Sequence, residues 1–393
     1  MDALPPGLFC DCEDDEIDVG DVARPARVRR IALIGNSLPR KCGIATFTTD
    51  CFNALRQSYP EIDARVYAME DSLGGIAYPP EVARTIREQD FGAYLEAARD
   101  IDDWGADAVW VQHEYGIFGG LAGEHLLALL DRVAAPVIVT LHTVLEEPDA
   151  DQRRVLERLL DRAGRVMVMA EKGAEILRRV YDADERKILV IPHGVPDRLL
   201  ADPESIKPRF GFSGRKVILT FGLLAPNKGI ETMIMAMPEI VAGHPESLYV
   251  VLGSTHPHLV AHEGESHRER LVALAETLGV ADNVAFLDEF ADHERLLDYL
   301  QAADVYVTPY LNPAQITSGT LSYAVGMGKA IVSTPYVHAT EALDEGHGVL
   351  VPFGDSGALA SEITRLLNDD VARRALSERA YARGRTMLWP RLA

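Results

Sequence analysis

The stretch from Tyr310 to Tyr336, YLNPAQITSGTLSYAVGMGKAIVSTPY, predicts the unit on which the fold depends. A run rich in β-branched residues (303–308) precedes its polar loop and a similar run (330–334) follows its helix, and both are typical of buried strands. Between them, the polar loop leads into a helix of mostly small residues over 321–327, which ends at Gly328. Strand, loop, helix and strand in this order form a βαβ unit.

The loop of this unit carries several hydroxyl groups where the helix is expected to begin. Its residues are Thr317, Ser318, Gly319 and Thr320. Such a loop suits a phosphate group, because free backbone N–H groups and the positive end of the helix point to one place. A plain helix cap explains the same residues, and the loop alone does not decide between the two.

Composition limits the classes of partner. The chain has 393 residues, which suits two domains, with 47% hydrophobic and 25% charged residues. No apolar run approaches the roughly 20 residues that span a bilayer, and the acidic N-terminus is unlike a signal peptide, so we expect a cytoplasmic protein without an integral membrane segment. A net charge of −21 argues against nucleic acid and against anionic lipid as partners.

The sequence does not imply a metal site. All four cysteines (Cys10, Cys12, Cys42 and Cys51) lie near the N-terminus, and no second Cys/His pair completes a set of ligands, so free thiols are expected. No DxD sequence follows a predicted strand. Residues 1–28 lack periodicity and are rich in acidic side chains, which predicts a disordered acidic tail.

Strands and helices alternate along the first half of the chain. Apolar strand-like runs begin with 30–35, and others follow at 64–68, 108–112, 137–141, 166–169 and 188–191. Helical patterns separate most of them, at 44–57, 91–99, 123–132, 152–162 and 172–181. Near-continuous apolar strands joined by helices predict a parallel sheet covered on both faces.

A polar linker (201–215) precedes a second series of the same kind, with strands at 216–222, 247–252, 284–287 and 303–308 and helices at 230–241, 268–278, 293–302 and 369–387. We therefore expect an α/β protein of two Rossmann-like, doubly wound parallel-sheet domains facing a cleft, at 29–205 and 206–372. Residues 373–393 are expected to cross back as a helix onto the first domain. Because the chain ends soon after Trp389, we expect either a trimmed chain or a module of a longer polypeptide. The oligomeric state, including a homo-oligomer, also stays open.

Polar clusters follow three predicted strands of the first domain. His113 and Glu114 come after one strand, His142 after the next, and His193 after the last. Ligands of parallel sheets bind beyond the carboxyl ends of the strands, so these side chains predict a site. Gly43, at the start of the first helix, lets another molecule approach the backbone. The neighbouring Arg40 and Lys41 either meet an anion or are solvated.

Segments of the second half resemble, in the same order, the nucleotide-sugar domain of the GT-B glycosyltransferases, specifically glycosyltransferase family 4. They are FGLLAPNKGIETMIMAM (221–237), LYVVLGSTHP (248–257), NVAFLDEFADHERLLDYLQAADVYVTPY (283–310), GKAIVSTPYVHATEAL (328–343) and HGVLVPFGD (347–355). In the first half, VQHEYG (111–116), TLHT (140–143) and IPHGVP (191–196) fall where the family has strand-end motifs. The resemblance implies the GT-B fold and a nucleoside-diphosphate sugar, GDP- or UDP-linked, as donor.

The resemblance also assigns roles to single residues. Lys228 matches the lysine that contacts the donor's diphosphate, where a fixed positive charge serves a site without metal. His113 matches the histidine beside the transferred sugar. The donor side further includes Gly43, Gly222, Gly253 and Glu341, and the acceptor or sugar side includes Glu114, His142 and His193.

Three positions depart from the family pattern. The two glutamates that the family places eight positions apart are Gln315 and Tyr323 here, counted back from the glycine at 328. Gln315 still hydrogen-bonds a sugar hydroxyl but carries no charge, and Tyr323 offers stacking or one hydrogen bond instead of a grip on the ribose diol. Leu223 replaces an arginine, and the hydroxyls and amides of 317–320 are expected to compensate. The polar insertion 256–268 either lines the pocket or forms a surface loop.

The leading hypothesis is a retaining, metal-independent glycosyltransferase. It moves a hexose, mannose or glucose by family frequency, from a nucleoside-diphosphate sugar to a sugar or other hydroxyl acceptor, without a further cofactor. Lys228 and the loop 317–320 hold the diphosphate, and His113 and Gln315 orient the sugar; no nucleophile is named. Two alternatives stay open: a glycoside phosphorylase that uses a sugar phosphate, and a non-catalytic sugar- or nucleotide-binding partner of an active homologue.

Overall fold

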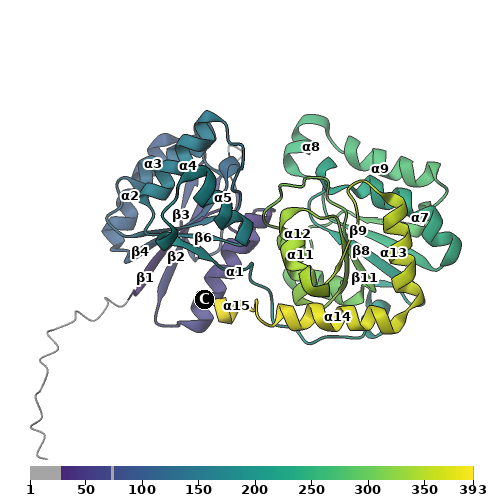
Figure 1. The fold of residues 1–393 in the computed structure, drawn as a ribbon. Coiled ribbons are helices and arrows are strands. Elements are labelled where there is room, and N and C mark those ends of the chain that lie inside the picture. Colours follow the sequence, from purple (N-terminus) through teal and green to yellow (C-terminus); the bar gives the residue numbers. More distant parts are fainter. Residues whose placement is uncertain (1–27, 72–74, 393) are drawn as a thin grey trace, which may run out of the picture.

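The structure is a computed structural model that describes residues 28–71 and 75–392. Two α/β domains lie side by side, and the last helices return from the second domain to the first (Figure 1). Cys10, Cys12 and all but the last residue of the predicted acidic tail lie outside the described residues. Cys42 and Cys51 are free thiols, as expected.

The first domain is built on a seven-stranded parallel sheet in the order β3-β2-β1-β4-β5-β6-β7. Its strands are β1 (Arg30–Gly35), β2 (Asp63–Glu70), β3 (Val82–Arg87), β4 (Ala108–His113), β5 (Val137–Leu141), β6 (Arg165–Val168) and β7 (Ile188–Val190). Its helices are α1 (Gly43–Ser58), α2 (Phe91–Trp104), α3 (His125–Leu130), α4 (Ala150–Arg162) and α5 (Glu171–Tyr181). The order reverses beside β1, which is the switch point where doubly wound sheets bind ligands.

The second domain has a six-stranded parallel sheet in the order β10-β9-β8-β11-β12-β13. Its strands are β8 (Lys216–Phe221), β9 (Ser247–Leu252), β10 (Val284–Leu287), β11 (Val305–Thr308), β12 (Ala330–Ser333) and β13 (Val349–Leu350). Its helices are α6 (Pro203–Ile206), α7 (Ile230–Gly243), α8 (Pro257–Glu263), α9 (Ser266–Thr277), α10 (His293–Ala302), α11 (Gly319–Gly326), α12 (Val337–Ala342), α13 (Ser356–Asn368) and α14 (Asp370–Gly384), followed by α15 (Trp389–Leu392). The predicted fold class is confirmed.

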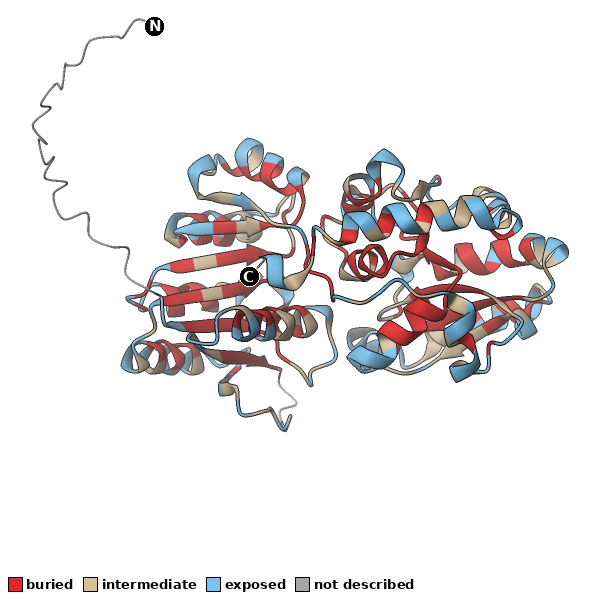
Figure 2. Ribbon diagram, turned by 90° about the horizontal axis from the view of Figure 1, so that it is seen from below, coloured by how far each residue is buried: buried red, intermediate tan, exposed pale blue. Residues whose placement is uncertain are grey.

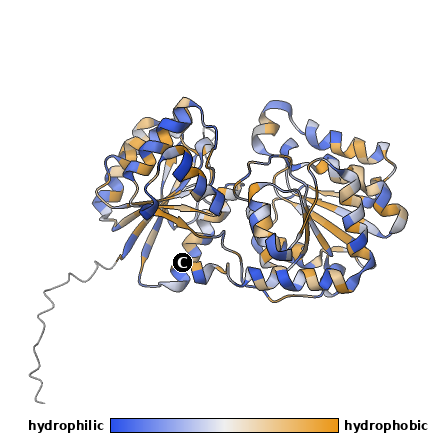
Figure 3. Ribbon diagram, viewed as in Figure 1, coloured by the Kyte–Doolittle hydropathy of each residue, from blue (hydrophilic) through white to orange (hydrophobic). Residues whose placement is uncertain are grey.

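The central strands form the cores of both domains. Every residue of β9, β11 and β12 is buried, because helices cover both faces of the sheet, and the strands appear as the buried, hydrophobic interior in Figures 2 and 3. Two-sided burial explains why these strands are continuous apolar runs rather than alternating ones. The strands β3 and β13 and the helix α13 were not predicted; β3 has a polar, half-exposed pattern and β13 is only two residues long.

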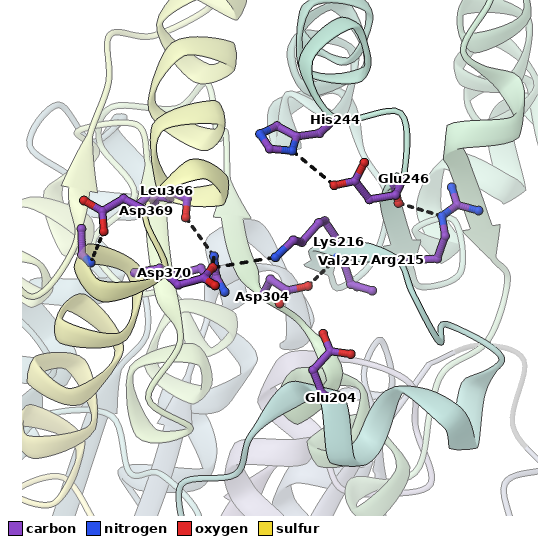
Figure 4. Close-up of polar contacts among 12 residues, drawn as sticks. Glu204, Arg215, Lys216, Val217, His244, Glu246, Asp304, Leu366, Asp369 and Asp370 are labelled. Atoms are coloured by element: carbon purple, nitrogen blue, oxygen red, sulfur yellow. Dashed lines mark hydrogen bonds and ion pairs between the residues drawn. The ribbon is translucent and has the colours of Figure 1, made fainter.

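The predicted linker is fixed to the second sheet by a buried ion pair. Lys207 is fully buried, and its ammonium lies 2.8 Å from a carboxylate oxygen of Asp304. The same oxygen of Asp304 accepts the backbone N–H of Val217 at 2.7 Å (Figure 4). Nearer the surface, Lys216 lies 3.8 Å from Asp370 at the start of α14 (Figure 4). The linker therefore leads directly into β8 in a defined position.

The return to the first domain differs from the prediction in its extent. The helix α14 packs on the second domain, where the backbone of Gly384 lies against Gly326 of α11. It is α15 that packs on α1 of the first domain. Its Trp389 ring lies against the backbone of Gly194, so close that a Cβ on Gly194 would be 2.2 Å from the ring. Because most residues of α14 are polar, this helix lies on the surface of the second domain, and only the short α15 reaches the first domain. Among the described residues, we find no helix with the length and hydrophobicity of a bilayer span.

Candidate functional site

Three histidines lie at the carboxyl edge of the first sheet, as their positions after strands predicted. The edge of the Phe47 ring on α1 contacts the rings of His142 and His193, with centroids 4.8 and 4.9 Å apart. His142 donates through Nε2 to the side chain of Gln112 at 3.1 Å, and His193 donates through Nδ1 to the carbonyl of Gly194 at 2.8 Å. Burial lowers the pKa of His142 to about 3 and that of His193 to about 4, so both rings are neutral.

His113 keeps its hydrogen-bonding capacity free. Its side chain is fully buried, stacked on Phe118 with ring centroids 6.0 Å apart, and neither ring nitrogen has a partner among the described residues. Burial lowers its pKa to about 4. A buried polar group without a partner is costly, and most such groups in native structures bind a ligand, a water or an ion. The expected position beside a sugar hydroxyl would satisfy this ring.

The Glu114 side chain forms hydrogen bonds within the loops at the carboxyl edge of the sheet. Its carboxylate accepts the hydroxyl of Thr143 at 2.6 Å and the backbone N–H of Tyr115 at 3.0 Å. Burial raises the pKa of Glu114, and these two hydrogen bonds work against that rise. The contact joins the loops after β4 and β5, so Glu114 stabilises the edge that carries His113 and His142.

Lys228 lies in the turn after β8, with its ammonium above an aromatic ring. The Lys228 Nζ is 4.0 Å from the centre of the Tyr310 ring. The Tyr310 hydroxyl shares a hydrogen bond of 2.8 Å with Thr320 Oγ1, which lies 3.1 Å from Ser318 Oγ. One tyrosine therefore connects Lys228 to the loop 317–320. Burial lowers the pKa of Lys228 to about 8.

The loop 317–320 caps α11 and meets two histidines. Ser318 accepts the N–H of Leu321 through its side chain at 3.3 Å and donates its own N–H to Nδ1 of His338 at 2.9 Å. A Cβ on Gly319 would lie 2.9 Å from Nε2 of His193, so glycine lets the first domain approach the helix. His338 was missed by the sequence analysis, although it also follows a strand, β12, by a few residues. Burial lowers its pKa to about 3.

Three residues assigned to the donor or the sugar contact the protein itself. Gln315 donates to the carbonyl of Thr317 at 3.0 Å. Tyr323 donates to Asp50 of α1 at 2.6 Å, across the domain boundary. Glu341 accepts the backbone N–H groups of residues 171 and 172, at the start of α5, at 2.8 Å each. Two of the three positions that depart from the family pattern, Gln315 and Tyr323, thus take part in contacts within and between the domains. Glu341, which matches the pattern, also joins the two domains.

Asp50 was also missed, because nothing in its helical surroundings marks it. Burial raises its pKa, while the hydrogen bond from Tyr323 and the nearby His293 lower it. The carboxylate comes from α1, the tyrosine from α11, and the histidine from the start of α10. The three residues bring together elements from both domains beside the loop 317–320.

The predicted glycines allow close backbone packing at the strand ends. A Cβ on Gly253, whose φ is 151°, would lie 2.0 Å from the carbonyl oxygen of Gly222. These residues belong to loops that pair beyond β8 and β9, next to Lys228. Gly43 begins α1, and among the residues that the structure describes, no atom would lie within 4 Å of a Cβ there, so these residues leave the space beside it open. The helix is capped by the Cys42 thiol, which accepts the N–H of Ala45.

The two open questions about polar segments have structural answers. Arg40 hydrogen-bonds the carbonyl of Met69 at 3.2 Å and lies 3.7 Å from Asp71, so it serves the loop rather than solvent. The insertion 256–268 forms α8 and the start of α9, and Arg268 donates to the carbonyl of Gly253 at 2.7 Å. It braces the loop after β9.

Within 28–71 and 75–392, no group of three or more His, Cys, Asp or Glu residues could hold a metal ion.

Two family models match the chain, one for each domain. The model of glycosyltransferase family 4 matches residues 43–199, and the model of glycosyl transferases group 1 matches residues 202–383. Together they follow the division into two sheets, and their boundary falls just before α6.

Curated relatives are similar over part of their length. A D-inositol 3-phosphate glycosyltransferase from Stackebrandtia nassauensis is 27% identical over 267 residues, which cover 65% of this chain and 58% of that protein. A protein of the same name from Corynebacterium glutamicum is 27% identical over 291 residues, covering 68% of this chain and 67% of that one. The chain therefore matches about three fifths to two thirds of the length of these relatives.

Solved structures share the arrangement of both domains. Anabaena HepE in complex with UDP superposes with a TM-score of 0.68 at 17% identity, covering 92% of this chain and 96% of that one. Sucrose-phosphate synthase from Thermosynechococcus elongatus superposes with a TM-score of 0.73 at 20% identity, covering 92% and 95%. At these identities the similarity establishes the fold, which is GT-B.

Proposed function

Since the chain belongs to the group 1 glycosyltransferases, with the GT-B fold, we propose that it transfers a hexose from a nucleoside-diphosphate sugar to a hydroxyl of a sugar or polyol. The proposed reaction retains the anomeric configuration and needs no metal. The HepE structure contains UDP, and the curated relatives are named for inositol 3-phosphate, which is a polyol. These names support the classes of donor and acceptor and leave the individual sugar as mannose or glucose by family frequency.

The observation that carries the proposal is the placement of Lys228. Its ammonium lies at the end of β8, next to the Gly222 and Gly253 loops and one ring away from the start of α11. A cation and a helix N-terminus that face the same space suit a diphosphate, because both stabilise the negative charge that develops on the leaving group. His113 supports the sugar side, since its two free nitrogens require a hydrogen-bonding partner.

The residues then have separate tasks. Lys228 and the amides and hydroxyls of 317–320 hold the diphosphate in the second domain. His113 and Gln315 orient the transferred sugar, and Glu114, His142 and His193 shape the acceptor side. Gly43 leaves room for the substrates at the start of α1. Catalysis by position and electrostatics, without a protein nucleophile, is the mechanism that this arrangement favours.

The test is turnover of a panel of UDP- and GDP-linked hexoses by the whole chain. Lys228→Ala should abolish turnover, and its thermal unfolding should match that of the unmodified protein. Lys216→Ala is the control, because Lys216 begins β8, at the end opposite to Lys228, and pairs with Asp370 near the surface, so its loss should leave turnover unchanged. Turnover by Lys228→Ala at the rate of the unmodified protein would refute the assignment.

A second candidate is a non-catalytic binding partner of an active homologue. Its support is the use of Tyr323, Gln315 and Glu341 in contacts of the protein with itself. This candidate predicts donor binding in calorimetry without turnover across the same panel. An increase in the activity of an active homologue on mixing would then identify the partner role.

A further inference from the structure

The ammonium of Lys228 is held by a ring and not by an acid. Its Nζ lies 4.0 Å from the centre of the Tyr310 ring. Within the described residues, burial is the cause of its lowered pKa, and no carboxylate forms an ion pair with it. By contrast, Lys207 of the same domain is fully buried and has two carboxylate partners. Lys228 therefore keeps its positive charge available.

The Tyr310 ring is itself held in place from three sides. It is 1% exposed and stacks on Tyr336, with centroids 5.3 Å apart and planes 20° apart. Thr334 donates its hydroxyl to the Tyr310 carbonyl at 2.5 Å. The Tyr310 hydroxyl meets Thr320 at 2.8 Å. A ring fixed in this way presents one face to Lys228 and one edge to the loop at the start of α11.

We propose that Tyr310 is a positioning residue for diphosphate binding, because its ring face aims the Lys228 ammonium at the loop 317–320 while its hydroxyl holds Thr320 of that loop. The inference rests on the proposed function and adds to it the residue that joins the two halves of the phosphate site. A carboxylate could also hold the lysine, but it would compete with the phosphate for the charge. An aromatic face attracts the cation without neutralising it.

A purely structural role for Tyr310 makes different predictions. As a core residue, Tyr310 would affect the stability of the domain and leave affinity for a diphosphate unchanged once the protein is folded. As a positioning residue, it affects affinity through Lys228, and the conservative variant that keeps the ring keeps most of that affinity. The two roles are separated by measuring binding and unfolding on the same variants.

The experiment is calorimetric titration of the whole chain with UDP and GDP, with thermal unfolding of each variant as a check of folding. Tyr310→Leu should weaken binding about tenfold, the upper range for loss of a cation–π contact in a partly desolvated site. Tyr310→Phe keeps the ring and should stay within about threefold of the unmodified protein, the loss expected for one neutral hydrogen bond. In a Lys228→Met background, Tyr310→Leu should weaken binding by no more than about threefold, which is the loss expected for the hydroxyl alone.

Tyr299→Leu is the matched control. Tyr299 is a buried tyrosine of the same domain that stacks on Phe210 with ring centroids 4.0 Å apart, and the guanidinium of Arg295 lies 5.1 Å from its ring centre. This variant should lower thermal stability and leave nucleotide affinity unchanged.

Three outcomes overturn the inference. Tyr310→Leu that binds as tightly as the unmodified protein removes the role, and an equal loss in the Lys228→Met background shows that the ring does not act through the lysine. A Tyr310→Phe variant as weak as Tyr310→Leu shows that the hydroxyl, not the ring, is responsible. By contrast, an unmodified protein that binds neither UDP nor GDP overturns the proposed function as well.

Discussion

Acid should unfold this protein because it buries four neutral histidines, three at the carboxyl edge of the first sheet and one beside Ser318. Burial lowers the pKa of His113 and His193 to about 4 and that of His142 and His338 to about 3, whereas a histidine in an unfolded chain titrates near 6.5. Because the folded pKa is the lower one, the unfolded chain binds more protons as the pH falls. Stability is therefore complete above about pH 6.5 and is lost progressively as the pH falls toward the folded values.

The size of the loss follows from the same values. In the unfolded chain each histidine is about half protonated at about pH 6.5 and almost fully protonated at about pH 5, whereas in the folded chain it binds almost no proton over the same range. The free energy of unfolding changes by about 1.4 kcal/mol per pH unit for each proton that only the unfolded chain binds. Each histidine therefore lowers the free energy of unfolding at pH 5 by about 2 kcal/mol. The four costs are not independent, because His193 and His113 help to lower the pKa of His142, and His193 helps to lower that of His338. Their sum of about 8 kcal/mol is therefore an upper value for the loss of stability, and it is comparable to the whole stability of a typical domain, about 5–15 kcal/mol.

The assay is urea unfolding, followed by tryptophan fluorescence, at a series of pH values from about 7.5 to 5. The free energy of unfolding should fall steeply over that range, and His338→Gln should remove about a quarter of the slope. His347→Gln is the control, because His347 lies in a surface turn and bonds the carbonyl of Asp344. A free energy of unfolding that stays constant from pH 7.5 to 5 would refute the placement of these rings in a desolvated cluster.

Three further predictions concern packing, and urea unfolding measures each. Ile316→Ala should cost about 2–5 kcal/mol, because this side chain of the second domain is 6% exposed and belongs to the core of the first; Val371→Ala, 80% exposed, should cost almost nothing. Gly194→Ala should cost about 1–3 kcal/mol, because its Cβ would lie 2.2 Å from the Trp389 ring, whereas Gly164→Ala has 3.6 Å to its nearest neighbour and should be tolerated; equal stability of the two would contradict the docking of α15. Asp304→Asn should lower the free energy of unfolding by about 3–5 kcal/mol, since it leaves the buried Lys207 without its buried partner. Asp370→Asn, in the exposed pair with Lys216, should lower it by less than about 1 kcal/mol. The reverse order would show that the buried pair does not stabilise the protein more than the exposed one.

The sequence was sufficient for the fold because its strands are long apolar runs buried on both faces. Runs such as 247–252 and 303–308 contrast clearly with the amphipathic helices between them, and their alternation allows little besides two parallel sheets. The missed strand β3 lies at an edge, where one face is half-exposed and the alternation VARTIR is mild. The missed β13 is too short to have a period at all.

The positions of the candidate residues were predictable at the strand ends and not where the two domains meet. His113 at the end of β4 and His142 and His193 after β5 and β7 lie close together because the carboxyl ends of parallel strands share one edge, which is a property of topology alone. Tyr323 and Asp50 lie 273 positions apart, and their contact depends on how one domain is set against the other. No local periodicity encodes that placement, so Asp50 and His338 could be recognised only in the structure.

The first turn of α5, in the first domain, is capped by Glu341 of the second domain. Ala170, before α5, offers no side-chain cap, so the carboxylate of Glu341 is the acceptor for the first two amides of the helix. Whenever the domains separate, these two amides exchange an anionic acceptor for water, and the first turn of α5 becomes free to fray. The rate of deuterium uptake at the amides of residues 171 and 172 should therefore report how often the two domains separate. A saturating concentration of donor that holds the domains together should slow this uptake.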